Sequence, residues 1–250
     1  MGDPVLKDRL AVVTGASRGV GYQAALGFAR AGAHVIALAR TVGGLEELDD
    51  EIREAGGAAT LVPLDITDYD ALDRLGQTIF DRWGKLDIVL GNAGELGVPT
   101  PLSQLKPSVF DEVMAVNVTA NFRLLRSLDP LLQKSDAGRA LFITSGAARS
   151  QRPYLGPYAA SKAALEAMVT AYAKENRLTN VNANLVDPGT LRTKMRRLYA
   201  PGEDPETVTP PEAIVDTLIR LVSAENTVNG GRFAFPTQEW EQGGLSRIAF

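Results

Sequence analysis

Short apolar runs alternate with longer amphipathic stretches along the whole chain, and this alternation constrains the fold more than any other feature. The apolar runs are Leu10–Thr14, His34–Ala39, Thr60–Pro63, Leu86–Leu90, Ala140–Thr144, Val181–Val186 and Arg232–Phe235. The stretches with helical spacing are Gly21–Ala31, Leu45–Ala55, Asp68–Trp83, Val109–Leu132, Tyr158–Leu178 and Pro211–Val222. Short strands that alternate with helices predict a parallel sheet covered by helices on both faces. No repeat or linker divides the pattern, so we expect a single α/β domain over residues 1–250.

The composition excludes several classes of protein. The chain has no cysteine and a single histidine, His34, which excludes a disulfide scaffold and a thiolate or multi-histidine metal centre. We therefore expect no metal and a structural role for His34. The net charge is −4, whereas a surface that binds nucleic acid is basic, so we expect no nucleic-acid partner. No run of about 18 apolar residues occurs, and the N-terminus lacks the apolar part of a signal peptide, so we expect a cytoplasmic protein without a membrane partner.

A glycine-rich turn follows the first predicted strand and leads directly into a helix. Its glycines follow the pattern Gly15-xxx-Gly19-x-Gly21. Glycines at such a turn let the backbone approach a pyrophosphate, which rests on the positive end of the helix. A plain tight turn is the alternative, but the position between a strand and a helix favours dinucleotide binding. The expected contacts in this turn are Gly15, Ser17, Arg18, Gly19 and Val20.

The end of the second predicted strand decides between nicotinamide cofactors. An enzyme for NAD places a carboxylate there for the ribose 2′-hydroxyl, whereas this chain has Ala39 and Arg40. Together with Arg18 in the glycine-rich turn, Arg40 suits a 2′-phosphate, which a carboxylate would repel. The absent acid also argues against a methyltransferase, and the alternative for both arginines is an ordinary solvated surface. The sequence predicts NADP(H) as the cofactor.

Tyr158 and Lys162 are four residues apart on a predicted helix, so they share one face. A phenol titrates near pH 10, but a cation about 4 Å away lowers its pKa by up to about three units. The pair is therefore suited to giving a proton to a carbonyl oxygen. An ordinary surface pair is the alternative when these two residues are considered alone.

The spacing of the glycines and the Tyr-xxx-Lys pair together resemble the short-chain dehydrogenase/reductase family, in its single-domain, NADP-preferring form. The resemblance implies a Rossmann-like, doubly wound parallel sheet of about seven strands. It also implies hydride transfer between a nicotinamide and a small-molecule carbonyl or secondary alcohol, in a homodimer or homotetramer.

The same resemblance assigns further residues of the site. It implies that Ser145 holds the substrate oxygen and that Asn117 supports a proton-relay water, which with Tyr158 and Lys162 completes the catalytic set. The cofactor contacts that it implies are Asp65, Ile66, Asn92, Ala93, Gly94, Tyr158, Lys162, Pro188, Gly189, Leu191 and Thr193. Gly91 departs from the family, which has a second asparagine there, and we expect a looser hydrogen bond at that strand end.

The substrate is not fixed by these motifs. The proline-rich stretch 191–211 predicts a flap, and four cations lie at its start: Arg192, Lys194, Arg196 and Arg197. Arg149 and Arg152 precede Tyr158. Our hypothesis is that the substrate, or a carrier attached to it, is anionic, and the alternative is that these charges form a solvated helix face. Two alternative functions stand beside a general carbonyl reductase: a 3-oxoacyl thioester reductase, and an NADP(H)-sensing protein without turnover.

Overall fold

The computed structural model describes residues 4–241, so residues 1–3 and 242–250 of the predicted domain lie outside the described part. Within residues 4–241, eight strands form one sheet in the order β3-β2-β1-β4-β5-β6-β7-β8. Their bounds are β1 Leu10–Thr14, β2 His34–Ala39, β3 Ala58–Pro63, β4 Ile88–Gly91, β5 Gly138–Ile143, β6 Val181–Asp187, β7 Arg232–Ala234 and β8 Glu239–Glu241. The first seven are parallel, as expected, and β8 adds an antiparallel edge that was not predicted.

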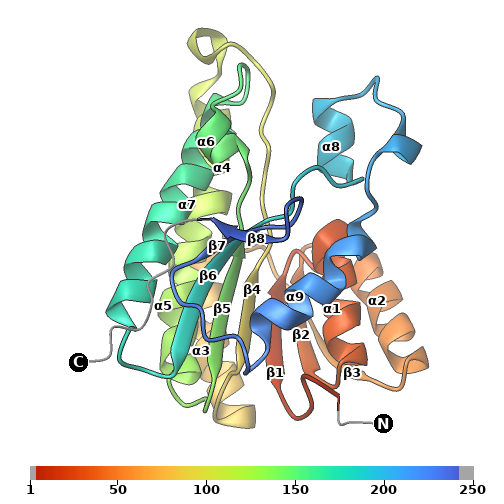
Figure 1. The fold of residues 1–250 in the computed structure, drawn as a ribbon, viewed down its shortest axis with the longest axis vertical. Helices are drawn as coiled ribbons and strands as arrows, with labels where there is room; N and C mark the ends of the chain where they lie inside the picture. Colours follow the sequence, from red (N-terminus) through yellow and green to blue (C-terminus); the bar gives the residue numbers. More distant parts are fainter. Residues whose placement is uncertain (1–3, 242–250) are drawn as a thin grey trace.

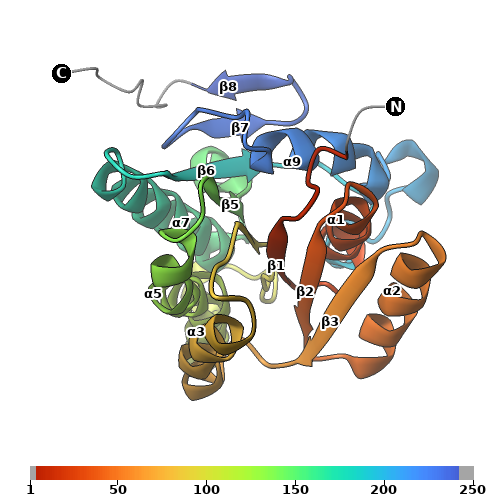
Figure 2. The ribbon, with the colours of Figure 1, turned by 90° about the horizontal axis from the view of Figure 1, so that it is seen from below.

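Helices cover both faces of the sheet. Figure 2 shows α1, α2 and α9 on one face and α3, α5 and α7 on the other. Their bounds are α1 Gly19–Arg30, α2 Val42–Glu54, α3 Tyr69–Trp83, α5 Ala120–Leu132, α7 Gly156–Glu175 and α9 Val215–Val222. Successive residues of β1 point to opposite faces, so Val13 packs in the core under α1 and Val12 in the core under α5. The expected doubly wound α/β domain is confirmed.

The single long helix expected over residues 109–132 is interrupted. It consists of α4, Pro107–Met114, a π-helical turn at Ala115–Thr119, and then α5. A π turn holds one additional residue relative to an α-helix and is often found at functional sites. Within α5, Pro130 donates no backbone hydrogen bond. Two short helices, α6 (Ala147–Ser150) and α8 (Lys194–Tyr199), lie beyond the sheet.

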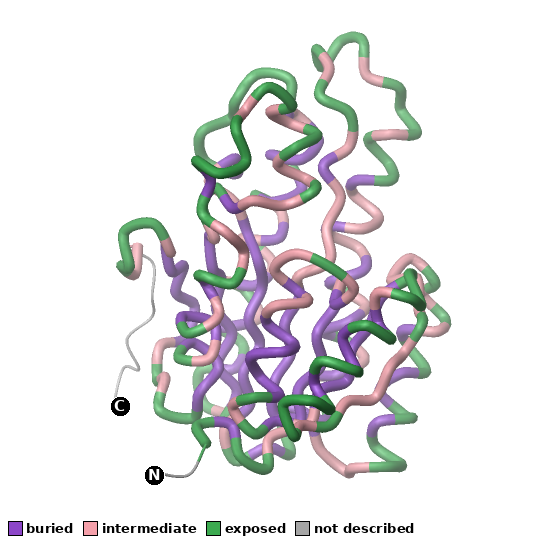
Figure 3. Tube along the Cα trace, turned by 90° about the vertical axis from the view of Figure 1, so that its right-hand side faces the viewer, coloured by how far each residue is buried: buried purple, intermediate pink, exposed green. Residues whose placement is uncertain are grey.

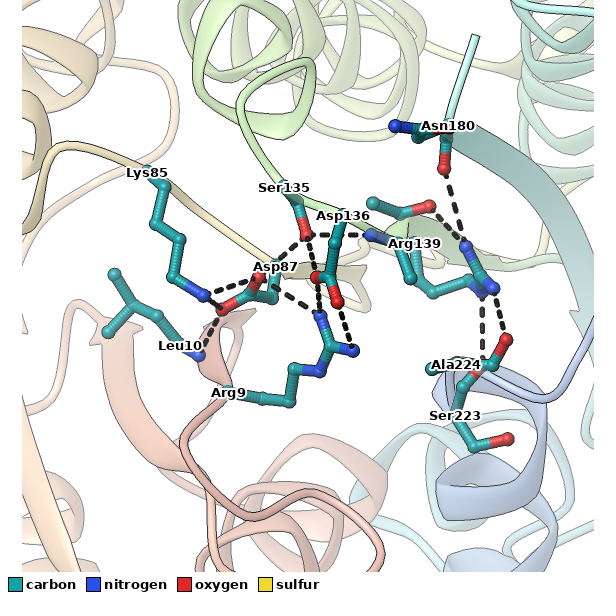
Figure 4. A network of polar contacts seen from close by, with 12 residues as sticks. Arg9, Leu10, Lys85, Asp87, Ser135, Asp136, Arg139, Asn180, Ser223 and Ala224 are labelled. Atoms are coloured by element: carbon teal, nitrogen blue, oxygen red, sulfur yellow. Dashed lines mark hydrogen bonds and ion pairs between the residues drawn. The ribbon is translucent and has the colours of Figure 1, made fainter.

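A polar network closes the end of the sheet where the strands begin (Figure 4). The fully buried carboxylate of Asp87 accepts hydrogen bonds from the backbone N–H of Leu10 at 2.9 Å and from Ser135 Oγ at 2.6 Å. Lys85 Nζ lies 3.0 Å from the same carboxylate, and Arg9 Nη1 lies 3.3 Å from it. The network joins the amino-terminal ends of β1 and β4 and leaves the opposite end of the sheet for the site.

Burial follows the sheet closely. In Figure 3 the inner strands of the sheet are buried, while exposed residues gather on the outer sides of the helices and in the segments that project beyond the sheet. The residues of the edge strands β3 and β8 are half-buried or exposed. No helix within residues 4–241 is both long and apolar enough to span a bilayer.

Candidate active site

A cavity of about 850 Å³ lies at the carboxyl ends of the strands. In the sheet, β2 and β3 lie on one side of β1, and β4 and the later strands lie on the other side. The chain therefore changes direction across the sheet between β1 and β4. Doubly wound folds bind their ligands at this point. The segments carrying α6 and α8 project beyond this end of the sheet (Figure 1). Every residue predicted to contact the cofactor lines the cavity, and so do Ser145, Tyr158 and Lys162.

The glycine-rich turn is shaped to admit a ligand next to its backbone. Gly15 and Gly19 have φ values of 68° and 58°, which side chains disfavour. A Cβ atom at Gly21 would lie 2.4 Å from Asn92 Nδ2 and 2.4 Å from the Gly15 carbonyl oxygen. The Asn92 side chain donates to the Thr14 carbonyl oxygen at 2.9 Å, which joins the turn to the end of β4. Asn92 therefore holds the glycine-rich turn in place and also lines the cavity.

Two exposed arginines stand at the side of the cavity next to β2 and β3. Arg40 has a side chain 61% exposed, and its Nη1 lies 3.7 Å from Asp65 Oδ2. Arg18, on the glycine-rich turn, is also exposed. Burial alone would raise the pKa of Asp65, but hydrogen bonds from Thr67 and the charge of Arg40 outweigh it and lower the pKa. Cations of this kind, beside a backbone cradle, fit a dinucleotide with an additional phosphate.

Tyr158 and Lys162 project from the first turns of α7 into the cavity. The Lys162 ammonium donates to the Ile143 carbonyl oxygen at 2.8 Å and lies 5.8 Å from the centroid of the Tyr158 ring. Ser145 is the second residue after β5, which ends at Ile143. Three groups suited to proton transfer and oxygen binding therefore converge from two neighbouring elements.

The pKa of Tyr158 does not move in the expected direction. Burial raises it to about 12, a hydrogen bond with Ser145 opposes this rise, and the charge of Asp187 adds to it. Burial lowers the pKa of Lys162 to about 8, against the opposing charge of Glu166. The expectation that Lys162 lowers the phenol pKa fails in this structure because the ammonium points to a backbone carbonyl and the phenol is almost fully buried.

Asn117 lies in the π turn, behind the cavity wall. It is fully buried, and its Oδ1 accepts from the Glu95 N–H at 2.7 Å. Its Nδ2 donates to the Glu95 carbonyl oxygen at 2.8 Å and to Ser161 Oγ at 2.9 Å. The side chain thus joins the loop after β4 to α7. Unlike the other predicted catalytic residues, Asn117 does not line the cavity.

The family model for short chain dehydrogenases matches residues 9–204. The chain belongs to this family. An uncharacterized oxidoreductase of Escherichia coli K12, YciK, is 37% identical over 97% of both chains. A short chain dehydrogenase structure from Shigella flexneri, complexed with NADP, is 38% identical with a TM-score of 0.89 and covers 93% of this chain and 99% of its own. One from E. coli CFT073, complexed with NADPH, is 37% identical with a TM-score of 0.87, over 94% and 99%. As a short-chain dehydrogenase, the protein is an oxidoreductase.

Gly91, where this member departs from the family pattern, has a packing explanation. A Cβ atom there would lie 2.2 Å from Cδ1 of Phe142 on the neighbouring strand β5 and 2.9 Å from Asn121 Oδ1. Phe142 is itself fully buried. Gly91 therefore makes room for the ring of Phe142 in the core. The motif around Asn92 does not contain Phe142, so the sequence motif alone could not show this packing.

The residues of the flap of this short-chain dehydrogenase contact one another. Thr193 caps α8, its Oγ1 accepting from the Arg196 N–H at 3.2 Å. The Arg196 guanidinium makes two bonds of 2.6 Å to Glu203, and Arg192 lies 2.5 Å from Glu206. Two of the four predicted substrate-binding cations are therefore already paired within the flap.

An apolar wall of the cavity was not predicted. It is formed by the buried residues Leu96, Ala147, Leu155 and Tyr158, on which Met195 and Tyr199 of α8 pack. Ala159 belongs to the same apolar cluster but does not line the cavity. These residues come from four separate segments of the chain, so no local pattern brings them together. Of these residues, the sequence motifs identified Tyr158.

Proposed function

We propose that this protein is an NADP(H)-dependent carbonyl reductase, or the reverse alcohol dehydrogenase, acting on a small molecule. The observation that carries the proposal is the convergence of Ser145, Tyr158 and Lys162 in the cavity that the glycine-rich turn also lines. When bound, the cofactor supplies or accepts the hydride.

Residues from both halves of the site would hold the cofactor. The turn from Gly15 to Val20 would bind the pyrophosphate at the start of α1, and Arg18 and Arg40 would bind the 2′-phosphate. Asp65 and Ile66 would contact the adenine. Asn92, Ala93 and Gly94 would line the middle of the site. At the nicotinamide end the contacts would be Pro188, Gly189, Leu191 and Thr193 together with Tyr158 and Lys162.

Tyr158 would give its proton to the substrate oxygen in reduction, while the Ser145 hydroxyl donates a hydrogen bond to the same oxygen. The ammonium of Lys162 would stabilise the resulting phenolate and bind the ribose. Because its pKa is about 8, Lys162 changes charge close to neutral pH. Asn117 would position the site by its hydrogen bonds to the Glu95 backbone and to Ser161 Oγ, which hold the loop after β4 against α7.

We further propose that the substrate combines an apolar body with an anionic group. The apolar wall formed by Leu96, Leu155 and the flap residue Met195 suits the body. Arg152 and Lys194 line the cavity and are exposed, so they would receive the anion, whereas Arg196 is engaged by Glu203. A 3-oxoacyl thioester on a carrier and a small ketone carboxylate both meet this description.

The first experiment follows NADPH absorbance with ketones, aldehydes and 3-oxoacyl thioesters, charged and uncharged. Tyr158→Phe is expected to abolish turnover and to keep NADPH binding. Tyr154→Phe is the control, because Tyr154 is close in sequence but exposed and outside the cavity lining. Full turnover in Tyr158→Phe would refute the assigned role, and NADPH binding without turnover of any carbonyl would favour the sensor.

The charge of the substrate has its own test. For an anionic substrate, Arg152→Gln and Lys194→Gln are each expected to raise KM by roughly tenfold and to weaken its dependence on salt. Arg197→Gln serves as the control, since Arg197 does not line the cavity. Equal KM values in all variants would reject the anionic group.

We also propose that the protein forms a homodimer or homotetramer in the cytoplasm. The outer side of α7 presents the exposed small residues Ala160, Ala163, Ala167 and Ala171, which suit close packing against a second copy. Light scattering with size-exclusion chromatography is expected to give at least a dimer, and Ala167→Glu to dissociate it. A monomeric wild-type protein would contradict this.

A further inference from the structure

Arg232 lies at the start of β7 and connects three carboxylates. Its side chain is only 5% exposed. Nε donates to Glu166 Oε1 at 2.9 Å, Nη2 donates to Asp187 Oδ2 at 2.7 Å, and Nη1 contacts Glu241 on β8. All three nitrogens of the guanidinium are therefore engaged, each with an acid from a different element.

Two of these carboxylates connect Arg232 with elements that carry active-site residues, and Asp187 itself lines the cavity. Glu166 is one helical turn after Lys162 on α7, and it also accepts from Thr144 Oγ1 at 2.8 Å, the residue directly before Ser145. Asp187 ends β6 and lines the cavity, and its Oδ1 accepts from the Gly189 N–H at 3.0 Å. Through these two acids, Arg232 reaches the elements that carry the serine, the lysine and the Pro188–Gly189 turn.

The charges in this cluster are close to balance. Arg149 is the second cation, with its Nε 3.5 Å from Glu166 and its Nη1 2.5 Å from Glu241. Two guanidinium groups thus face three carboxylates. The charge of Asp187 contributes to the raised pKa of Tyr158. The charge of Glu166 partly opposes the lowering of the Lys162 pKa by burial. Both acids that act on the catalytic pair are therefore acids that Arg232 neutralises.

We propose that Arg232 is a positioning residue of the active site, which fixes the ends of β5, β6 and the first turns of α7 relative to one another and balances the charge beside Tyr158 and Lys162. A merely structural ion cluster would affect stability alone. A positioning role also predicts a change in the protonation of the catalytic pair when the cation is removed. The proposal rests on the proposed function for its catalytic meaning, but its electrostatic part can be tested without cofactor.

The groups that face the catalytic pair fix the direction of the expected shifts. From β6 comes Asp187, from α7 Glu166, and behind Glu166 lie Arg232 from β7 and Arg149 from α6. Replacing Arg232 by glutamine leaves the acids less compensated, which favours protonated Lys162 and protonated Tyr158. Replacing Glu166 by glutamine has the opposite effect on Lys162.

The test titrates Lys162 in the cofactor-free protein by NMR of lysine labelled with ¹³C at Cε, with the resonance assigned by Lys162→Met. In Arg232→Gln the midpoint of Lys162 is expected to rise by about one pH unit, and in Glu166→Gln to fall by about one unit. Arg139→Gln is the matched control, because Arg139 is equally buried but lies at the start of β5, at the opposite end of the sheet. In Arg139→Gln the titration midpoint of Lys162 is expected to equal that of the wild type.

A kinetic measurement complements the titration. In alcohol oxidation, which needs deprotonated Tyr158, the pH of half-maximal kcat is expected to rise by about one unit in Arg232→Gln. We expect kcat at neutral pH to fall roughly tenfold while KM changes less than about threefold. Absence of turnover in the wild type would count against the proposed function only, because the titration does not depend on it.

An unchanged Lys162 midpoint in a folded Arg232→Gln, or an equal shift in Arg139→Gln, would overturn the proposal. If Arg232→Gln does not fold, Glu166→Gln decides: a lowered midpoint supports the proposal, and an unchanged or raised one refutes it.

Discussion

Replacing Arg40 with alanine tests the choice of cofactor. A hydrogen bond to a charged phosphate contributes about 1.5–3 kcal/mol, and an exposed ion pair contributes about 0–1 kcal/mol. Since the Arg40 side chain is 61% exposed and Asp65 already lies 3.7 Å from it, we expect a contribution between these two ranges, about 1–2 kcal/mol. The Kd for NADPH should therefore rise about 5- to 30-fold, and that for NADH should stay the same.

The assay measures the Kd of each cofactor by fluorescence, together with the ratio of kcat/KM for NADPH and NADH. Arg53→Ala is the control, because Arg53 is an exposed arginine of α2 that pairs with Asp49 and does not line the cavity. Higher salt should reduce the NADPH preference of the wild type and leave that of Arg40→Ala nearly unchanged. Equal weakening of NADPH and NADH binding would refute the reasoning, because it would mean that Arg40 shapes the site without contacting the 2′-phosphate.

Three further predictions concern stability, measured by urea unfolding. Because burial lowers the pKa of Lys162 to about 8, charged Lys162 costs free energy at pH values below 8, so Lys162→Met should raise stability at neutral pH by up to about 3 kcal/mol. This gain should shrink as the pH rises from 8 towards the unfolded pKa, and a gain independent of pH would contradict it. Asp87→Ala leaves buried donors unpaired and should cost about 3–5 kcal/mol without changing the Kd for NADPH; a cost below 1 kcal/mol would show that water replaces the carboxylate. Gly91→Ala should cost about 1–3 kcal/mol because Phe142 must move, whereas Gly43→Ala, with no atom within 4 Å of its Cβ, should stabilise α2 by about 0.5–1 kcal/mol; equal effects would refute the packing argument.

The central strands and the residues of the glycine-rich turn that line the cavity could be predicted because their signals are local. A buried parallel strand reads as a short apolar run, and a phosphate turn needs glycines at fixed positions next to that run. The edge strand β8 has no such signal. Its three residues are Glu239, Trp240 and Glu241, and it is held by the pairing of Trp240 with Phe233 on β7.

The parts of the site that escaped prediction depend on contacts between distant segments. The partner of Arg196 is seven residues away in a flap without a regular pattern, and Arg232 meets Glu166 across 66 residues. The direction of the Tyr158 pKa shift was missed for a similar reason. Sequence spacing places Lys162 on the same helical face, but burial and the direction of the ammonium are properties of the folded chain.

The π turn at Ala115–Thr119 also fixes the number of residues in the continuous helical segment formed by α4, the π turn and α5. Each residue of an α-helix rotates the following side chains by about 100°. Deleting one residue there would restore a regular helix and rotate one flank relative to the other. Either Asn117 would turn away from the Glu95 backbone, or the apolar stripe of α5 with Leu124 and Leu128 would leave the core. We therefore expect natural variants to change the surface of α4 and α5 freely while keeping the number of residues between Glu95 and Leu124 constant.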